Sequence, residues 1–128
     1  MRSAQRVLVV DDDREIVQAL SVRLRAMGHE PLAAYDGESG LALAIETIPD
    51  AIVLDMRMPA MDGLKVLAGL RAGDATRDIP VIVLSASLVD RATAVDQGAF
   101  CFIEKPYDAK VLAAALNQAL SVRLKKDT

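Results

Sequence analysis

The sequence contains no tryptophan, a single cysteine and a single histidine, which excludes several kinds of site. It offers no set of Cys and His side chains for zinc. Its one thiol, Cys101, cannot form a disulfide within the chain, which agrees with a reducing compartment. Only two Tyr and two Phe are available for base stacking, and a net charge of -3 leaves no strongly basic face to follow a phosphate backbone. We therefore expect no direct binding of nucleic acid.

Long apolar runs are also missing. The apolar stretches at Val7–Val10, Ala51–Leu54 and Val81–Leu84 have four residues each, whereas a helix that crosses a bilayer needs about 20. No apolar segment of the secretory type follows the charged first residues. We expect a cytoplasmic protein without a membrane segment, and the length of 128 residues predicts one domain over 1–128.

The short apolar runs are rich in Val, Ile and Leu, which is typical of parallel strands buried on both faces, and segments with helical spacing lie between them. The predicted strands lie near 6–10, 30–34, 51–55, 80–84 and 100–104. The predicted helices lie near 14–27, 38–47, 63–72, 88–96 and 108–124. Asp62 can cap the third helix, and Gly28 and Gly98 can take the left-handed conformation that ends a helix.

Pro31 lies inside the second predicted strand, where a missing N–H is tolerated only at a sheet edge. Right-handed crossovers between alternating strands and helices then favour an α/β, flavodoxin-like (βα)5 three-layer sandwich, with a parallel five-stranded sheet in the order 2-1-3-4-5. Ligands of such sheets bind beyond the carboxyl ends of the strands. The residues at those ends are therefore the candidates for function.

The strand ends carry Asp11, Asp12, Asp55, Ser85 and Lys105, which the topology brings to one pocket. Carboxylates gathered there repel each other by about 1 to 4 kcal/mol per close pair, so they require a compensating cation. Oxygen ligands suit a hard ion such as Mg²⁺, with Mn²⁺ as a possible substitute. A metal, an ammonium and a hydroxyl around Asp55 are the equipment of phosphoryl transfer, with that carboxylate as the nucleophile.

Each of these residues also has a structural interpretation. Acidic residues after a strand often cap the next helix, which we expect of Asp13 and which is as good an account of Asp11 and Asp12 taken alone. A loop serine such as Ser85 or a surface lysine such as Lys105 is unremarkable in isolation. The functional interpretation depends on their coincidence at four strand ends.

The sequence resembles a response-regulator receiver domain of two-component signalling over essentially its whole length. Four stretches carry the resemblance: Val7-Leu8-Val9-Val10-Asp11-Asp12-Asp13, Leu54-Asp55-Met56-Arg57-Met58-Pro59-Ala60-Met61-Asp62-Gly63, Pro80-Val81-Ile82-Val83-Leu84-Ser85-Ala86 and Lys105-Pro106. Each stretch is weak alone, but four in this order and spacing are very specific.

The resemblance implies that Asp55 accepts a phosphoryl group from a phosphohistidine on a sensor histidine kinase or a phosphotransfer protein. It also implies that Asp12, Asp55 and the backbone carbonyl of Arg57 ligate Mg²⁺, with Asp11 helping directly or through water. We expect no enzymatic activity beyond this self-phosphotransfer and autodephosphorylation. The long cation of Arg57 is a departure, and we hypothesise that it screens the phosphoryl group or hinders the attacking water.

By the same resemblance, Ser85, Lys105 and the Ala86 N–H would contact the phosphoryl oxygens, and the Lys105–Pro106 bond would be cis. Phe102 matches an aromatic residue whose rotamer is coupled to Ser85. Phosphorylation would then change the partner affinity of the face formed by the last two helices and the strand between them. The segment from Ser85 to Lys105 is about two residues shorter than the resemblance predicts, which puts the fourth helix or its preceding loop in doubt.

Some alternatives remain open at this level. The chain could be an inactive receiver used as a scaffold, or, less favoured, a flavodoxin-like cofactor-binding enzyme, although it lacks the glycine-rich loop that such sites use. The sequence does not name the downstream target. It also does not decide between a monomer and a phosphorylation-dependent dimer.

Overall fold

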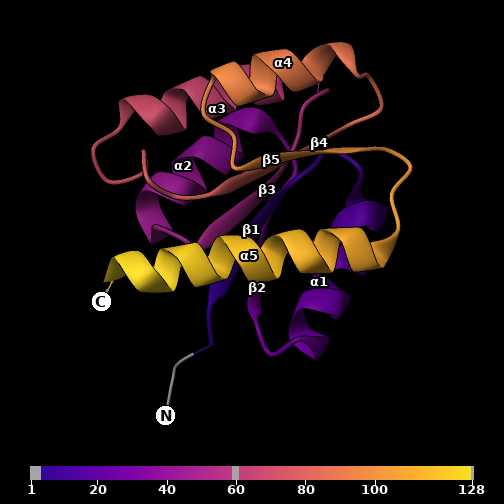
Figure 1. Ribbon diagram of the computed structural model, residues 1–128, viewed down its shortest axis with the longest axis vertical. Helices are drawn as coiled ribbons and strands as arrows, with labels where there is room; N and C mark the ends of the chain where they lie inside the picture. The colour runs from indigo at the N-terminus through magenta and orange to yellow at the C-terminus, as the bar shows by residue number, and fades with distance from the viewer. Residues whose placement is uncertain (1–3, 59–60, 128) are drawn as a thin grey trace.

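The computed structural model describes residues 4–58 and 61–127, and in them five strands alternate with five helices (Figure 1). The elements are β1 (Arg6–Val10), α1 (Arg14–Ala26), β2 (Glu30–Ala34), α2 (Gly37–Thr47), β3 (Ala51–Asp55), α3 (Gly63–Ala72), β4 (Val81–Ser85), α4 (Val89–Asp96), β5 (Cys101–Glu104) and α5 (Ala109–Asp127). All ten predicted elements are present. The prediction for β4 was wrong by one residue: Ser85 is its last residue and pairs with Glu104, so it is held by the sheet instead of lying in the following loop.

All strand pairs are parallel, and the sheet order β2-β1-β3-β4-β5 confirms the predicted topology. β2 is an edge strand, as Pro31 required. The N–H of Glu30 donates to the carbonyl of Gln5 at 2.9 Å, so the nitrogen of the next residue, Pro31, faces away from β1. The proline therefore removes no hydrogen bond from the sheet.

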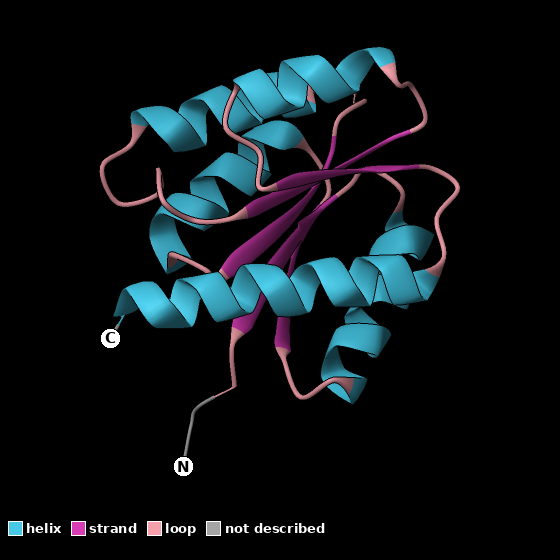
Figure 2. Cartoon of the chain, viewed as in Figure 1, coloured by secondary structure: helices cyan, strands magenta, loops and turns pink. Residues whose placement is uncertain are grey.

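Helices cover both faces of the sheet, α1 and α5 on one face and α2, α3 and α4 on the other (Figure 2). Alternate residues of β1 point to opposite faces, so Val7 and Val9 pack with α1 and α5, whereas Leu8 and Val10 pack with the other three helices. Each fully buried Val or Leu contributes about 1.5 to 3 kcal/mol of hydrophobic free energy. The two clusters fix the strand register, because a slip by one residue would exchange the two faces.

The starts of α1 and α3 have the predicted caps. The side chain of Asp13 accepts from the N–H groups of Glu15 and Ile16, and that of Asp62 accepts from the N–H of Lys65 at 3.0 Å. Among the helices of the described residues, none combines the length and apolarity needed to cross a bilayer.

The start of α3 lies directly against the end of β3. A Cβ placed on Gly63 would lie 2.5 Å from the carbonyl oxygen of Asp55 and 2.6 Å from the Cα of Met56, both of which are backbone atoms. We expect Gly63→Ala to lower the free energy of unfolding by about 1 to 3 kcal/mol, because the backbone at the end of β3 must move. Urea unfolding measures this change through the transition midpoint.

Gly69→Ala in the same helix is the matched control. Its Cβ would meet only the end of the flexible Leu41 side chain, and the helix propensity of Ala offsets the crowding by up to about 1 kcal/mol. Equal losses of stability in the two variants would contradict the steric account.

Candidate functional site

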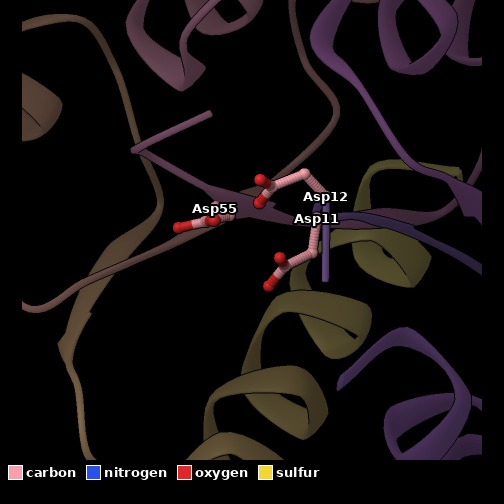
Figure 3. Close-up of side chains that lie close together, drawn as sticks. All are labelled: Asp11, Asp12 and Asp55. Carbon is pink, nitrogen blue, oxygen red and sulfur yellow. The ribbon is translucent and has the colours of Figure 1, made fainter. Parts of the chain in front are cut away.

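Asp11, Asp12 and Asp55 meet at the carboxyl ends of two neighbouring strands. β1 and β3 are paired with Val10 opposite Leu54. Asp11, which follows β1, and Asp55, the last residue of β3, therefore lie side by side. One carboxylate oxygen from each of the three residues lies within 4.8 Å of the others (Figure 3). The structure therefore brings together the three aspartates that the sequence placed in one pocket.

Two of these carboxylates are shielded from water. Asp11 is 2% and Asp55 5% exposed, whereas Asp12 is exposed. Asp11 accepts the N–H of Asp13 on one oxygen at 2.9 Å, but its second oxygen, Oδ2, is buried without a hydrogen-bond partner among the described residues. Burial raises the pKa of Asp11 to about 6, and the neighbouring charge of Asp55 adds to the effect.

Lys105 supplies positive charge to the cluster. Its Nζ lies 3.2 Å from Asp55 Oδ1 and 3.8 Å from Asp11 Oδ2. The Lys105–Pro106 bond is cis, as the resemblance implied, and the Lys105 N–H donates to the carbonyl of Ser85 at 2.8 Å. Within residues 4–58 and 61–127, this one ammonium faces three carboxylates, so the cluster has more acidic groups than basic ones.

These donors fit a hard divalent cation. They are all carboxylate oxygens, the ligand type that Mg²⁺ prefers, and a cation beside Asp11 would bind its Oδ2, which accepts no hydrogen bond from the described residues. The backbone N–H of Arg57 donates to Asp55 Oδ1 over 3.4 Å, which places this residue's main chain beside the cluster.

Ser85 is also at this edge of the sheet, but its hydroxyl is bonded elsewhere. Its Oγ donates to Asp90 Oδ2 at 2.6 Å and accepts the N–H of Ser87 at 3.1 Å. Ala86, the next residue, is exposed. Phe102 is half-buried on β5, where it packs against the hydrophobic core under α2, α3 and α4. The guanidinium of Arg91 lies 5.4 Å from the centre of its ring.

Asp90, in the first turn of α4, is a residue of this region that the sequence did not indicate. The Arg57 side chain makes two bonds to it, Nε to Oδ2 at 2.9 Å and Nη2 to Oδ1 at 3.0 Å. The Arg57 guanidinium, together with the Ser85 hydroxyl, holds the pKa of Asp90 below its usual range. The sequence showed only an acidic residue five positions after Ser85. Because the start of α4 was uncertain, the direction of this side chain could not be predicted.

Comparison with known proteins agrees with the fold and the acidic cluster. The sequence profile described as "Response regulator receiver domain" matches residues 7–117. The chain therefore belongs to the family of response regulator receiver domains, the receiver modules of two-component signalling.

Two relatives are transcriptional regulators. The transcriptional regulatory protein PrrA of Mycobacterium leprae is 45% identical over 123 residues, which are 94% of this chain and 52% of that protein. The transcriptional regulator RpaA of Synechocystis is 37% identical over 90% of this chain and 48% of that protein. The chain thus spans about half the length of these curated relatives.

Three solved structures match over nearly their whole length. Chemotaxis protein CheY4 of Vibrio cholerae has a TM-score of 0.85 at 29% identity, over 92% of this chain and 100% of that one. A receiver domain from Clostridium thermocellum has a TM-score of 0.88 at 30% identity, over 97% and 99%. The receiver domain of a sensor histidine kinase from Pseudomonas aeruginosa, at 26% identity and a TM-score of 0.85 over 93% and 99%, is described with a magnesium ion coordinated in its active site cleft.

The burial of Asp11 predicts a pH-dependent stability of the metal-free protein. Its pKa is higher in the folded protein, about 6, than its ordinary value of 3.8, so the fold binds the proton more tightly. This contribution to the free energy of unfolding is present below pH 3.8 and is lost as the pH rises through about 6. In excess EDTA, we expect Asp11→Asn to be more stable than the wild type by about 1 to 2 kcal/mol at neutral pH.

Urea unfolding of both proteins from pH 4 to pH 8 measures the difference, in which the other titrating groups cancel. The gain should shrink toward zero at the acid end. A difference that does not vary with pH would show that the buried charge is not its cause.

Proposed function

We propose that this chain is a phosphorylation-controlled receiver in which Asp55 is the phosphoryl acceptor. The observation that supports it best is the placement of Asp55 Oδ1 at 3.2 Å from the Lys105 ammonium, with the carboxylates of Asp11 and Asp12 beside it. An Asp55 oxygen forms a bond to phosphorus as the phosphorus–nitrogen bond of a phosphohistidine breaks. The imidazole leaves with that electron pair and takes up a proton.

In this proposal Asp12, Asp55 and the backbone carbonyl of Arg57 hold Mg²⁺, and Asp11 takes part directly or through water. The ion supplies positive charge toward the phosphoryl oxygens when it is bound. Mn²⁺ could take its place, because it accepts similar oxygen ligands. The excess of carboxylates over the Lys105 ammonium and the Asp11 oxygen that accepts no hydrogen bond from the described residues support this assignment.

The phosphoryl oxygens would be held by groups from the neighbouring strand ends. Lys105 neutralises one oxygen, since its ammonium already faces Asp55. Ser85 is the last residue of β4 and Ala86 follows it, so the Ser85 hydroxyl and the Ala86 N–H lie at the same edge of the sheet and would bind others. Charge neutralisation and positioning of this kind account for most of the catalysis in phosphoryl transfer.

The partner on the input side is then a sensor histidine kinase or a phosphotransfer protein. On the output side, phosphorylation would shift Ser85 and Phe102 and alter the face made by α4, β5 and α5. PrrA and RpaA are named as transcriptional regulators, so a DNA-bound target lying outside this chain is one form the output could take. A cytoplasmic, single-domain receiver that acts as a monomer or as a phosphorylation-dependent dimer fits this proposal, with no chemistry beyond gaining and losing its own phosphoryl group.

Phosphorylation by acetyl phosphate with MgCl₂ tests the acceptor. Intact-mass spectrometry should show the mass of one phosphoryl group added to the wild type and none added to Asp55→Asn, because the amide is not a nucleophile toward phosphorus. Asp74→Asn is the matched control, since it removes an exposed carboxylate paired with Arg77 at 3.5 Å. It should be modified like the wild type.

The same experiment separates the other functions. An inactive scaffold or a cofactor-binding enzyme would leave the wild type unmodified. A phosphoryl group that persists in Asp55→Asn would place the acceptor at another residue.

Binding of Mg²⁺ should stabilise the fold through the aspartates. At a tenfold excess of ion over its dissociation constant the gain is about 1.4 kcal/mol, or a rise of roughly 3 to 6 °C in melting temperature. Thermal denaturation in MgCl₂ against EDTA should show this rise for the wild type and for Asp74→Asn. Asp12→Asn should lose most of it, because it removes an exposed ligand without disturbing the core. An equal rise in the melting temperature of Asp12→Asn would show that Asp12 is not a ligand of the ion.

A further inference from the structure

The hydroxyl of Ser85 is engaged by α4 and not by the acidic cluster. Its bond to Asp90 Oδ2, at 2.6 Å, is short for a hydroxyl and a carboxylate, which is the mark of a charge-assisted hydrogen bond. Asp90 is fixed in turn by the two bonds from the Arg57 guanidinium. A continuous chain of contacts thus joins Ser85, Asp90 and Arg57.

The hydroxyl has only one proton to donate. Serine is a single donor with two acceptor lone pairs, and here the proton goes to Asp90 while a lone pair accepts the N–H of Ser87. Ser85 cannot give the same proton to an oxygen of a phosphoryl group on Asp55. Contact with that group therefore requires the Ser85–Asp90 bond to break.

We propose that Asp90 is a positioning residue that holds the Ser85 hydroxyl toward α4 before phosphorylation and competes with the phosphoryl group for it. This inference rests on the proposed function. Asp90 touches neither Asp55 nor the cluster of aspartates in the described contacts; it acts through Ser85. The Ser85–Asp90 bond must break before Ser85 can contact the phosphoryl group. The site therefore holds the phosphoryl group less tightly than it would if the Ser85 hydroxyl were free.

Breaking the Ser85–Asp90 bond would affect the start of α4. Asp90 lies in the first turn of α4, a helix of eight residues that starts after Leu88, whose side chain has no acceptor to cap it. Asp90 is the acidic residue of that turn, where a negative charge favours the helix. Arg57, whose main chain contacts Asp55, ties this turn to the end of β3. Release of Ser85 therefore changes the hydrogen bonding at the start of α4, next to the exposed apolar side chains of Leu88 and Val89.

Beryllofluoride, a stable mimic of the phosphoryl group, tests the competition with the intact chain. Its dissociation constant is measured by isothermal titration calorimetry in saturating MgCl₂ for the wild type, Asp90→Ala, Ser85→Ala and the double variant. We expect Asp90→Ala to bind about three- to tenfold more tightly than the wild type, the effect of losing one competing hydrogen bond. Asp90→Asn, which keeps a neutral acceptor, should lie between the two.

The Ser85→Ala background shows whether Asp90 acts through the hydroxyl. Without the hydroxyl there is no proton to compete for, so the further Asp90→Ala change should leave the dissociation constant unchanged. A gain that persists in this background would overturn the proposal, because the Arg57 guanidinium freed from Asp90 would then be binding the anion itself. Asp74→Asn, which breaks a surface ion pair away from the site, should bind like the wild type.

The remaining outcomes separate this inference from the proposed function. A wild type that binds no beryllofluoride would overturn the phosphorylation site and this inference with it. A wild type that binds, with equal or weaker binding in Asp90→Ala, would overturn the role of Asp90 alone.

Discussion

Repulsion between carboxylates held out of water is the constraint on which the other features of this site depend. Asp11 and Asp55 are nearly fully buried, and a single ammonium at 3.2 and 3.8 Å does not neutralise them together with Asp12. The arrangement persists because the packing of β1 and β3 in the sheet outweighs this repulsion. The five residues of β3 and the last four of β1 are all buried, so hydrophobic packing on both faces fixes the points from which these side chains project. A bound cation would lower this repulsion between the carboxylates.

The topology and the acidic cluster could be predicted from the sequence because each rests on short-range rules. Apolar runs define the strands, Pro31 selects an edge, and the order of a parallel sheet then brings its carboxyl ends together. The cis bond before Pro106 followed from resemblance to a family. The last residue of β4 did not follow, because the ends of a strand depend on pairing with its neighbours, here Ser85 with Glu104.

The contact between Ser85 and Asp90 could not be predicted in the same way. Whether a hydroxyl donates toward α4 or toward the aspartates is a matter of side-chain rotation and of the exact start of a helix, neither of which leaves a pattern in the sequence. The side chain of Arg57 is a similar case. Its hypothesised effect on the phosphoryl group stays a prediction. In the structure its side chain pairs with Asp90, 33 positions away in the chain, and its backbone N–H contacts Asp55.

The proline on β2 has a consequence for how this domain can meet other proteins. A sheet edge ordinarily offers a row of outward donors and acceptors on which another strand can dock. At Pro31 the outward nitrogen carries no hydrogen, so a docking strand would face a missing bond at the second residue of a five-residue edge. At the opposite edge, β5 has only four residues. Extension of the sheet by a neighbour is thus disfavoured at both margins, and the helical surfaces are left as the natural places for contact.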